Sequence, residues 1–338
     1  MMNKYVFMGA SLVFCLQTVH ASDQNQGASA LDVPNSLSWT EQNCEKAKEA
    51  DPYLMYPTAC YQLLNLKEAA QHEGQRLAPE TISNGRVAMA FGTDGCFPSS
   101  PVWSKTEHDE IRANPGQDIN LKLTDKCAYN DQFEKSYVLY NEIPLKSSKK
   151  KDQNTYAARI YAMYAVKDET GVAGSSGYAH QHEWEHIIVW MKNDKPDYVS
   201  VTQHSAVATK KAKDVAHLKD DPNTFAVKYI HGRFWNILKV STHFFDFADK
   251  DKNGVAKNTN PTPSGQWFGL GENELVDYSK TSQKFQNIIA DKNNWGETRP
   301  RINDKSWLDG KVCNVFKCPF DFMKSNVIPW DNVKTMKD

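Results

Sequence analysis

Short runs rich in β-branched and aromatic residues constrain the fold of this chain more than any other feature of its sequence. Polar loops that carry Gly and Pro separate the runs, a spacing typical of antiparallel sheets rather than of βαβ units. The runs are Val87–Phe91, Ser136–Tyr140, Ala157–Val166, His186–Met191, Tyr198–Thr202, Phe225–Ile230 and Ile237–Phe247. We therefore predict a mainly β fold, an antiparallel β-sandwich with peripheral helices.

Helical patterns occur at the N-terminal side and between the later strands. Residues 38–73 predict a small helical hairpin, which begins with the capping-box spacing of Ser38 and Glu41. Two further helices are expected, at about 205–219 and 273–292. Alternatively, the second segment divides, and Thr281 caps a second, shorter helix there. We divide the chain into residues 1–21, a polar leader and helical hairpin over 22–87, and a β-sandwich domain over 88–338.

The first 21 residues have the pattern of a secretory signal peptide. Lys4 supplies the positive charge, and an apolar stretch of 12 residues follows, from Tyr5 to Leu16. That stretch is shorter than the roughly 20 residues that a membrane-spanning helix needs. Small residues at Val19 and Ala21 then predict cleavage after Ala21. We therefore expect a secreted, extracellular protein.

The cysteine count agrees with export, because an exported chain forms disulfides. Of the seven cysteines, Cys15 lies in the signal segment, which leaves six and 15 pairings of them. Their spacing favours three sequence-local pairs, and free buried thiols are the alternative. The pairs are Cys44–Cys60, Cys96–Cys127 and Cys313–Cys318.

The charge balance excludes one class of partner. The chain has 40 basic and 41 acidic residues, a formal net charge of −1. Proteins that bind nucleic acid through its phosphates usually have a clearly basic domain. We therefore expect no nucleic-acid partner.

Three histidines and two glutamates lie within the seven residues His180–His186, a density that indicates a functional site. The segment from His182 to His186 also fits the H-E-x-x-H pattern of zinc peptidases, which requires a helix. The β-branched and aromatic run 187–190 that follows favours a strand instead. The third ligand of the extended peptidase motif is also missing, since Lys192 stands at its position.

The same segment, followed by Ile-Ile-Val-Trp, resembles the Gly-His-Arg-His-Asp-Trp-Glu heptapeptide of the necrosis- and ethylene-inducing peptide-like proteins, the NPP1 family. Weaker resemblances occur in the same order along residues 88–325, among them Asp94–Pro98, Val166–Asp168 and Asn294–Gly296. The chain departs from the heptapeptide at three positions. Ala179, Gln181 and Glu183 stand where the family has Gly, Arg and Asp.

The resemblance implies an exported β-sandwich similar to actinoporins and lectins, with a divalent cation, calcium or magnesium, in an acidic cavity. Carried onto this sequence, it implies a cation site at Asp168, His180, Glu183 and Glu185. Carboxylates are the direct ligands that hard cations prefer. Residues in the outer shell or in contact with a lipid head group would be His182, His204 and His243.

The function implied by the resemblance is that of a monomeric cytolysin or toxin that binds membrane glycosphingolipid head groups, of plant type in the family, and not that of an enzyme. Two aromatic residues of a loop, Trp267 and Phe268, are expected to be exposed and to help the protein bind the membrane. The alternative is that both belong to the hydrophobic core. The alternative function is a secreted metal-dependent hydrolase of the H-E-x-x-H peptidase type that uses the same cluster.

Overall fold

The computed structural model describes residues 75–76, 81–92, 95–103, 111–117, 119, 127–128, 132–145, 151–168, 179–203, 206–235, 240–257, 267–271, 274–296, 298–304 and 307–308. Several predictions fall outside these ranges: the signal segment, the helical hairpin at 38–73, the pairs Cys44–Cys60 and Cys313–Cys318, and the position of His204.

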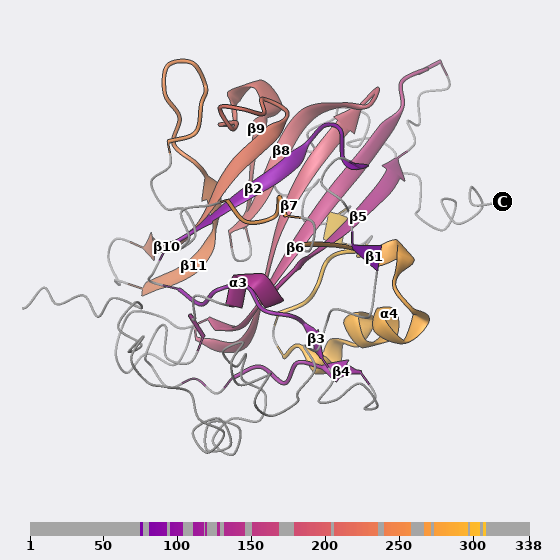
Figure 1. The fold of residues 1–338 in the computed structure, drawn as a ribbon, viewed down its shortest axis with the longest axis vertical. Coiled ribbons are helices and arrows are strands. Elements are labelled where there is room, and N and C mark those ends of the chain that lie inside the picture. The colour runs from indigo at the N-terminus through magenta and orange to yellow at the C-terminus, as the bar shows by residue number, and fades with distance from the viewer. Residues whose placement is uncertain are drawn as a thin grey trace, which may run out of the picture.

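A seven-stranded sheet forms the larger layer, and the long strands of this sheet run diagonally in Figure 1. In spatial order its strands are β1 (Gln75–Arg76), β12 (Leu275–Asp277), β5 (Val138–Leu145), β6 (Tyr156–Asp168), β7 (His180–Lys192), β8 (Lys195–Gln203) and β9 (Ala206–Lys211). The five strands from β5 to β9 follow one another in sequence, and each pairs antiparallel with the next.

A three-stranded sheet forms the second layer. Its order is β11 (Val240–Phe247), β10 (Thr224–Trp235) and β2 (Arg86–Phe91). The strand β2 lies parallel to β10, and β12 lies parallel to β5, so these two pairs make both sheets of the predicted antiparallel sandwich mixed. Parallel neighbours need long connections, and both pairs join strands from distant parts of the sequence. A short ribbon of β3 (Val102–Trp103) and β4 (Arg112–Ala113) completes the described strands.

Two apolar cores cover the two faces of the large sheet. One core fills the space between the sheets, where β6, β7 and β8 meet β2, β10 and β11 through residues such as Met163, Val189 and Phe245. The other lies on the opposite face, beneath helix α4 (Gln283–Ala290) and the segment that ends at Leu308. Figure 1 shows α4 on the side of the molecule away from β10 and β11. The mainly β, two-layer fold that the sequence predicted is therefore present.

The helix predictions need two corrections. Residues 205–219 contain β9 and one 3-10 turn (Ala212–Asp214) instead of a helix, because the segment pairs with β8. Residues 273–292 divide into β12, a 3-10 turn (Tyr278–Lys280) and α4, which Ser282 caps by accepting a hydrogen bond from the backbone N–H of Phe285. A short helix α3 (Gln132–Lys135) precedes β5. Among the described residues, no helix has the length and apolar character needed to span a membrane.

Candidate metal centre

The pairing of β6 with β7 brings the last residue of one strand beside the first residue of the other. Asp168 ends β6, His180 begins β7, and the antiparallel register places the two residues directly opposite each other. Residues opposite each other in a sheet share a face, so the Asp168 carboxylate and the His180 imidazole start from neighbouring positions.

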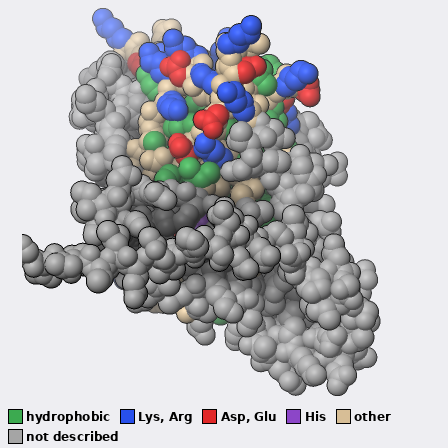
Figure 2. Space-filling model, turned by 90° about the vertical axis from the view of Figure 1, so that its left-hand side faces the viewer, with side chains coloured by type: hydrophobic (Ala, Val, Ile, Leu, Met, Phe, Trp, Pro, Cys, Tyr) green, Lys and Arg blue, Asp and Glu red, His purple; other side chains and the backbone are tan. Residues whose placement is uncertain are grey.

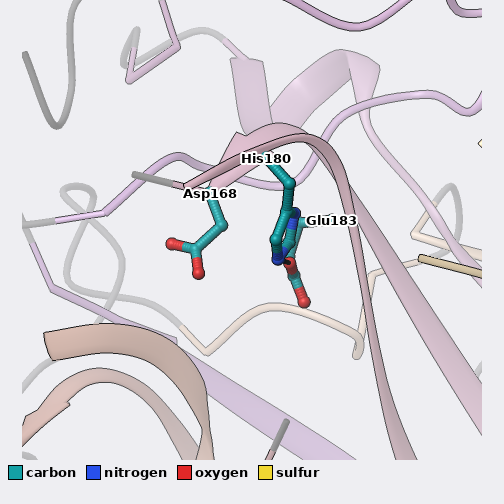
Figure 3. A group of neighbouring side chains, drawn as sticks. All are labelled: Asp168, His180 and Glu183. Carbon is teal, nitrogen blue, oxygen red and sulfur yellow. Dashed lines mark ion pairs between the residues drawn. The ribbon is translucent and has the colours of Figure 1, made fainter. Parts of the chain in front are cut away.

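Glu183 joins this pair from further along β7. Ligand atoms from Asp168, His180 and Glu183 all lie within 4.8 Å of one another. Figure 3 shows the three side chains pointing to the same side of the strand end. In a regular strand, residues three apart point to opposite faces. The backbone between His180 and Glu183 departs from this geometry at His182, whose φ is 66°.

The protonation of His180 follows from its neighbours. Its Nδ1 atom lies 2.7 Å from the backbone oxygen of His182, and because a carbonyl only accepts, Nδ1 carries a proton. In the neutral ring, Nε2 therefore presents a lone pair, and it faces Oε2 of Glu183 at 3.3 Å. Two lone pairs at this separation repel each other unless a proton or a cation lies between them.

Glu183 is buried, with 3% of its surface exposed, and its Oε2 atom accepts no hydrogen bond. Burial raises the pKa of Glu183 well above its ordinary value, and the negative charge of Asp168 raises it further. Hydrogen bonds from the Glu185 side chain and from the Trp184 backbone oppose this rise in part. The centre therefore brings two buried carboxyl groups so close together that burial and their mutual repulsion oppose the ionisation of Glu183.

Asp168 is held from the second sheet by His243 of β11. Nδ1 of His243 lies 2.7 Å from Oδ1 of Asp168, and the backbone N–H of His243 donates to Oδ2 at 3.4 Å. The His243 ring stacks on Tyr229, with the ring centroids 5.6 Å apart. Gly95 packs against the same ring, where a Cβ atom would lie 2.6 Å from Cδ2 of His243. The imidazole is thus fixed as an orienting partner of the carboxylate.

Glu185, predicted as a fourth ligand, lies outside the group of three. Its Oε2 atom accepts a hydrogen bond from the Thr202 hydroxyl, and the same hydroxyl oxygen accepts from the backbone N–H of His186 at 2.7 Å. The carboxylate is buried, with 2% exposed. This geometry favours a supporting position for Glu185 at the border of the centre.

The two histidines of the H-E-x-x-H pattern are bound to other parts of the protein. Nδ1 of His182 lies 2.9 Å from the Tyr164 hydroxyl, and Nε2 of His186 accepts from the backbone N–H of Arg301 at 2.8 Å. Burial lowers the pKa of His182 to about 4 and that of His186 to about 3, so both rings are neutral at pH 7. Because β7 is a strand, the peptidase arrangement on a helix is not formed.

The chemistry of the three donors suits a divalent cation. Two carboxylates and an imidazole nitrogen converge, and the buried Oε2 of Glu183 has no hydrogen-bond donor. Carboxylate oxygens suit calcium and magnesium, whereas the addition of an imidazole also suits manganese and zinc. The residues present therefore fit a bound cation, with Asp168, His180 and Glu183 as the candidate ligands.

The family resemblance implies most of this cluster but not the residues that support it. Asp168, His180, Glu183 and His243 were named, and the structure brings them together. Tyr164 and Thr202 were not, because a tyrosine or threonine inside a strand pattern gives no sign of what its hydroxyl binds. The predicted disulfide between Cys96 and Cys127 is present in the structure and anchors the segment that carries Gly95.

Comparisons with solved structures give weak overall similarity. The crystal structure of Necrosis and Ethylene inducing Protein 2, from the causal agent of cocoa's Witches Broom disease, is 19% identical, and the similarity covers 72% of this chain and 94% of that one, with a TM-score of 0.47. A structure of NLPPya in complex with mannosamine is 13% identical, with 71% and 93% coverage and a TM-score of 0.43.

Sequence comparison gives a more direct result. NLP effector protein 13 of Phytophthora capsici is 34% identical over 76 residues, which are 21% of this chain and 52% of that protein, so the match spans about half the length of this relative. The family model described as Necrosis inducing protein (NPP1) matches residues 87–310, more than half of the chain. The chain belongs to the NPP1 family of necrosis-inducing proteins.

Proposed function

We propose that this protein is a secreted, toxin-like cytolysin that binds a divalent cation at Asp168, His180 and Glu183 and uses the occupied centre to bind glycosylated sphingolipid head groups on a membrane. Family membership supports a necrosis-inducing activity. The expected cations are calcium and magnesium, by the resemblance described above, and the signal-like N-terminus supports export.

The observation that carries the cation proposal is the state of Glu183. A buried carboxylate with an oxygen that accepts no hydrogen bond is costly unless a positive charge balances it. Asp168, a second buried carboxylate, faces the same space. When bound, a cation would supply that positive charge and a Lewis-acidic surface to which hydroxyl or phosphate oxygens of a ligand can add.

The chain's own residues would orient the ligand atoms. His243 fixes the Asp168 carboxylate from the second sheet, and the backbone oxygen of His182 fixes the tautomer of His180. About 18% of the His180 side chain is exposed, whereas Asp168 and Glu183 are buried. We therefore place the approach of solvent and of a head group at the His180 side of the centre.

The test is cation-dependent thermal stability. Adding calcium or magnesium to chelator-treated protein is expected to raise Tm, because a ligand that binds only the folded state stabilises it by about 2.7 kcal/mol at 100 times Kd. For a domain of this size that corresponds to a rise of roughly 5 to 10 °C. Asp168→Asn is expected to abolish the rise, since it removes a ligand charge at nearly constant shape.

The matched control is Asp220→Asn, which makes the same chemical change at an exposed position. This variant is expected to respond to the cation as the unaltered protein does. Manganese and zinc are tested in parallel, because the imidazole donor suits them. An equal rise in Asp168→Asn would remove Asp168 from the site, and no rise with any of the four ions in the unaltered protein would refute the cation proposal.

A further inference from the structure

The backbone of His182 is unusual for a residue inside a paired strand. Its φ of 66° lies in the left-handed region, which non-glycine residues seldom adopt and which costs of the order of 1 kcal/mol or more. From Trp184 onward, β7 alternates regularly, with Ile187 in the core between the sheets and Ile188 in the core beneath α4. The departure in β7 thus lies at the two residues between His180 and Glu183, which are Gln181 and His182.

The left-handed residue has two effects on the metal centre. It places His180 and Glu183 on one side of the strand, with Nε2 and Oε2 3.3 Å apart. It also orients the His182 carbonyl, which accepts the hydrogen bond from Nδ1 of His180 at 2.7 Å. One backbone conformation therefore sets both the separation of two donors and the tautomer of one of them.

The side chain of His182 is held from three other elements. The Tyr164 hydroxyl on β6 lies 2.9 Å from its Nδ1 atom, and the Trp295 ring meets it edge-on at 5.6 Å. Gly116 leaves it room, since a Cβ atom at this position would come within 2.8 Å of Cε1. Gly116 is itself tied by a hydrogen bond from its N–H to Asn114, and the N–H of the next residue donates to β6.

We propose that His182 is a positioning residue for the cation centre, and that its left-handed backbone, locked by Tyr164, Trp295 and Gly116, is what brings His180 and Glu183 together. The inference rests on the proposed cation binding. It predicts that the cation affinity depends on the conformational preference at position 182 more than on the presence of an imidazole there.

The test compares two replacements of similar size with opposite preferences. Asparagine tolerates a positive φ, whereas valine, which is β-branched, does not. Calcium and magnesium binding to the full chain is measured by titration calorimetry for His182→Asn, His182→Val and Tyr164→Phe, at a temperature where circular dichroism shows each variant folded. Asp194→Val is the control, because Asp194 also has a positive φ, 58°, in the exposed β7–β8 turn.

Loss of an orienting partner typically weakens metal binding by about 10- to 100-fold, and we expect a change of this size in Kd for His182→Val. His182→Asn is expected to bind the cation at least several-fold more tightly than His182→Val. Tyr164→Phe is expected to bind the cation more weakly than the unaltered protein. Asp194→Val is expected to keep the original Kd while its thermal stability falls. These differences in Kd, which a purely structural role would not produce, support the proposal.

Equal Kd values for the asparagine and valine variants overturn the proposal. If His182→Val does not fold, the Kd of Tyr164→Phe tests the proposal, because this substitution removes only one oxygen atom. An unchanged Kd in that variant overturns the proposal as well. Absence of calcium and magnesium binding in the unaltered protein is a different result, which refutes the proposed function on which this inference rests.

Discussion

At the scale of single residues, Glu183 determines how the centre behaves without a cation. Its carboxyl group is buried beside Asp168, and one of its oxygens accepts no hydrogen bond. Ionising such a group costs free energy, so an ionised Glu183 lowers the stability of the folded protein when no cation is bound. The carboxylate that favours cation binding at this position therefore lowers the stability of the cation-free protein.

The substitution Glu183→Gln separates these two effects. Glutamine nearly keeps the shape of the neutral carboxyl group that burial and Asp168 favour at this position, so the chelator-treated variant is expected to melt no lower than the chelator-treated unaltered protein. The rise in Tm with calcium or magnesium is expected to disappear, because one ligand charge is gone. Differential scanning calorimetry with and without chelator measures both quantities.

Glu185→Gln is the matched comparison, two residues away on the same strand. Glu185 accepts from Thr202 and lies outside the group of three, so this variant is expected to keep a cation-induced rise in Tm, although a smaller one. If Glu185→Gln abolished the rise while Glu183→Gln retained it, the assignment of the two glutamates would be reversed.

The resemblance to the NPP1 family named these residues as a cation site, whereas the sequence did not show which of their side chains meet. The motif places Asp168 and His180 at the two ends of a strand–loop–strand unit, and antiparallel pairing then puts them opposite each other. A regular strand would turn Glu183 away from His180. The left-handed backbone at His182 is a tertiary effect of Tyr164, Trp295 and Gly116, and no local pattern encodes it.

At the scale of elements, the segment 95–103 connects the disulfide to the centre. Cys96 is bonded to Cys127, and the preceding residue, Gly95, packs against the His243 ring. The backbone N–H of Phe97 donates to the oxygen of Cys127 at 2.8 Å, and that of Ser99 donates to Tyr164 on β6. The covalent bond therefore holds in place the segment that confines His243.

Replacing both cysteines, Cys96→Ser with Cys127→Ser, is expected to lower the free energy of unfolding. The two residues are 31 apart in sequence, and closing a loop of that length is worth about 3 to 4 kcal/mol in the chain-entropy model. Urea denaturation at equilibrium measures the difference, and mass mapping of non-reduced peptides checks the linkage. Recovery of both cysteines as free thiols in the folded protein would contradict the assignment.

The strands that the sequence predicted correctly are those in which the local residue preference agrees with the position of the segment in the fold. The strands β6, β7 and β8 are rich in β-branched and aromatic residues and are buried as the pattern predicted. The segment at about 205–219 was predicted to be a helix, and its Ala and Lys residues at 206–213 do favour one. Pairing with β8 overrides that local preference, and this pairing depends on the tertiary fold rather than on the local sequence.

At the scale of the whole molecule, electrostatics provides little general attraction to an anionic membrane. The net charge is −1, and the described part of the face in Figure 2 has lysines and arginines interspersed with acidic side chains. Phe268, one of the two loop aromatics expected to meet the membrane, is buried in the core instead, with 1% exposed. The membrane binding proposed above therefore depends on specific contacts with head groups rather than on general charge attraction.

Co-sedimentation with liposomes tests this conclusion. We expect the protein to bind vesicles that contain glycosylated inositol phosphoceramides in the presence of calcium or magnesium, and to be released by chelator. Vesicles of phosphatidylcholine and phosphatidylserine alone are expected to bind little, and Asp168→Asn is expected to bind neither. Equal binding to both kinds of vesicle, unaffected by chelator, would contradict head-group recognition at the cation.

The outermost position of β9 has a consequence for aggregation. Among the described strands, β9 ends the large sheet, and the free edge of a sheet is a template on which a second chain can add a strand. Lys210 and Lys211 are both exposed at its end, and the ammonium group of Lys210 lies 4.4 Å from the Phe247 ring centroid. Lysines on an edge strand disfavour the addition of another strand, because the added strand would have to lie against their charged side chains, so Lys210 and Lys211 are expected to limit edge-to-edge association when the protein is concentrated.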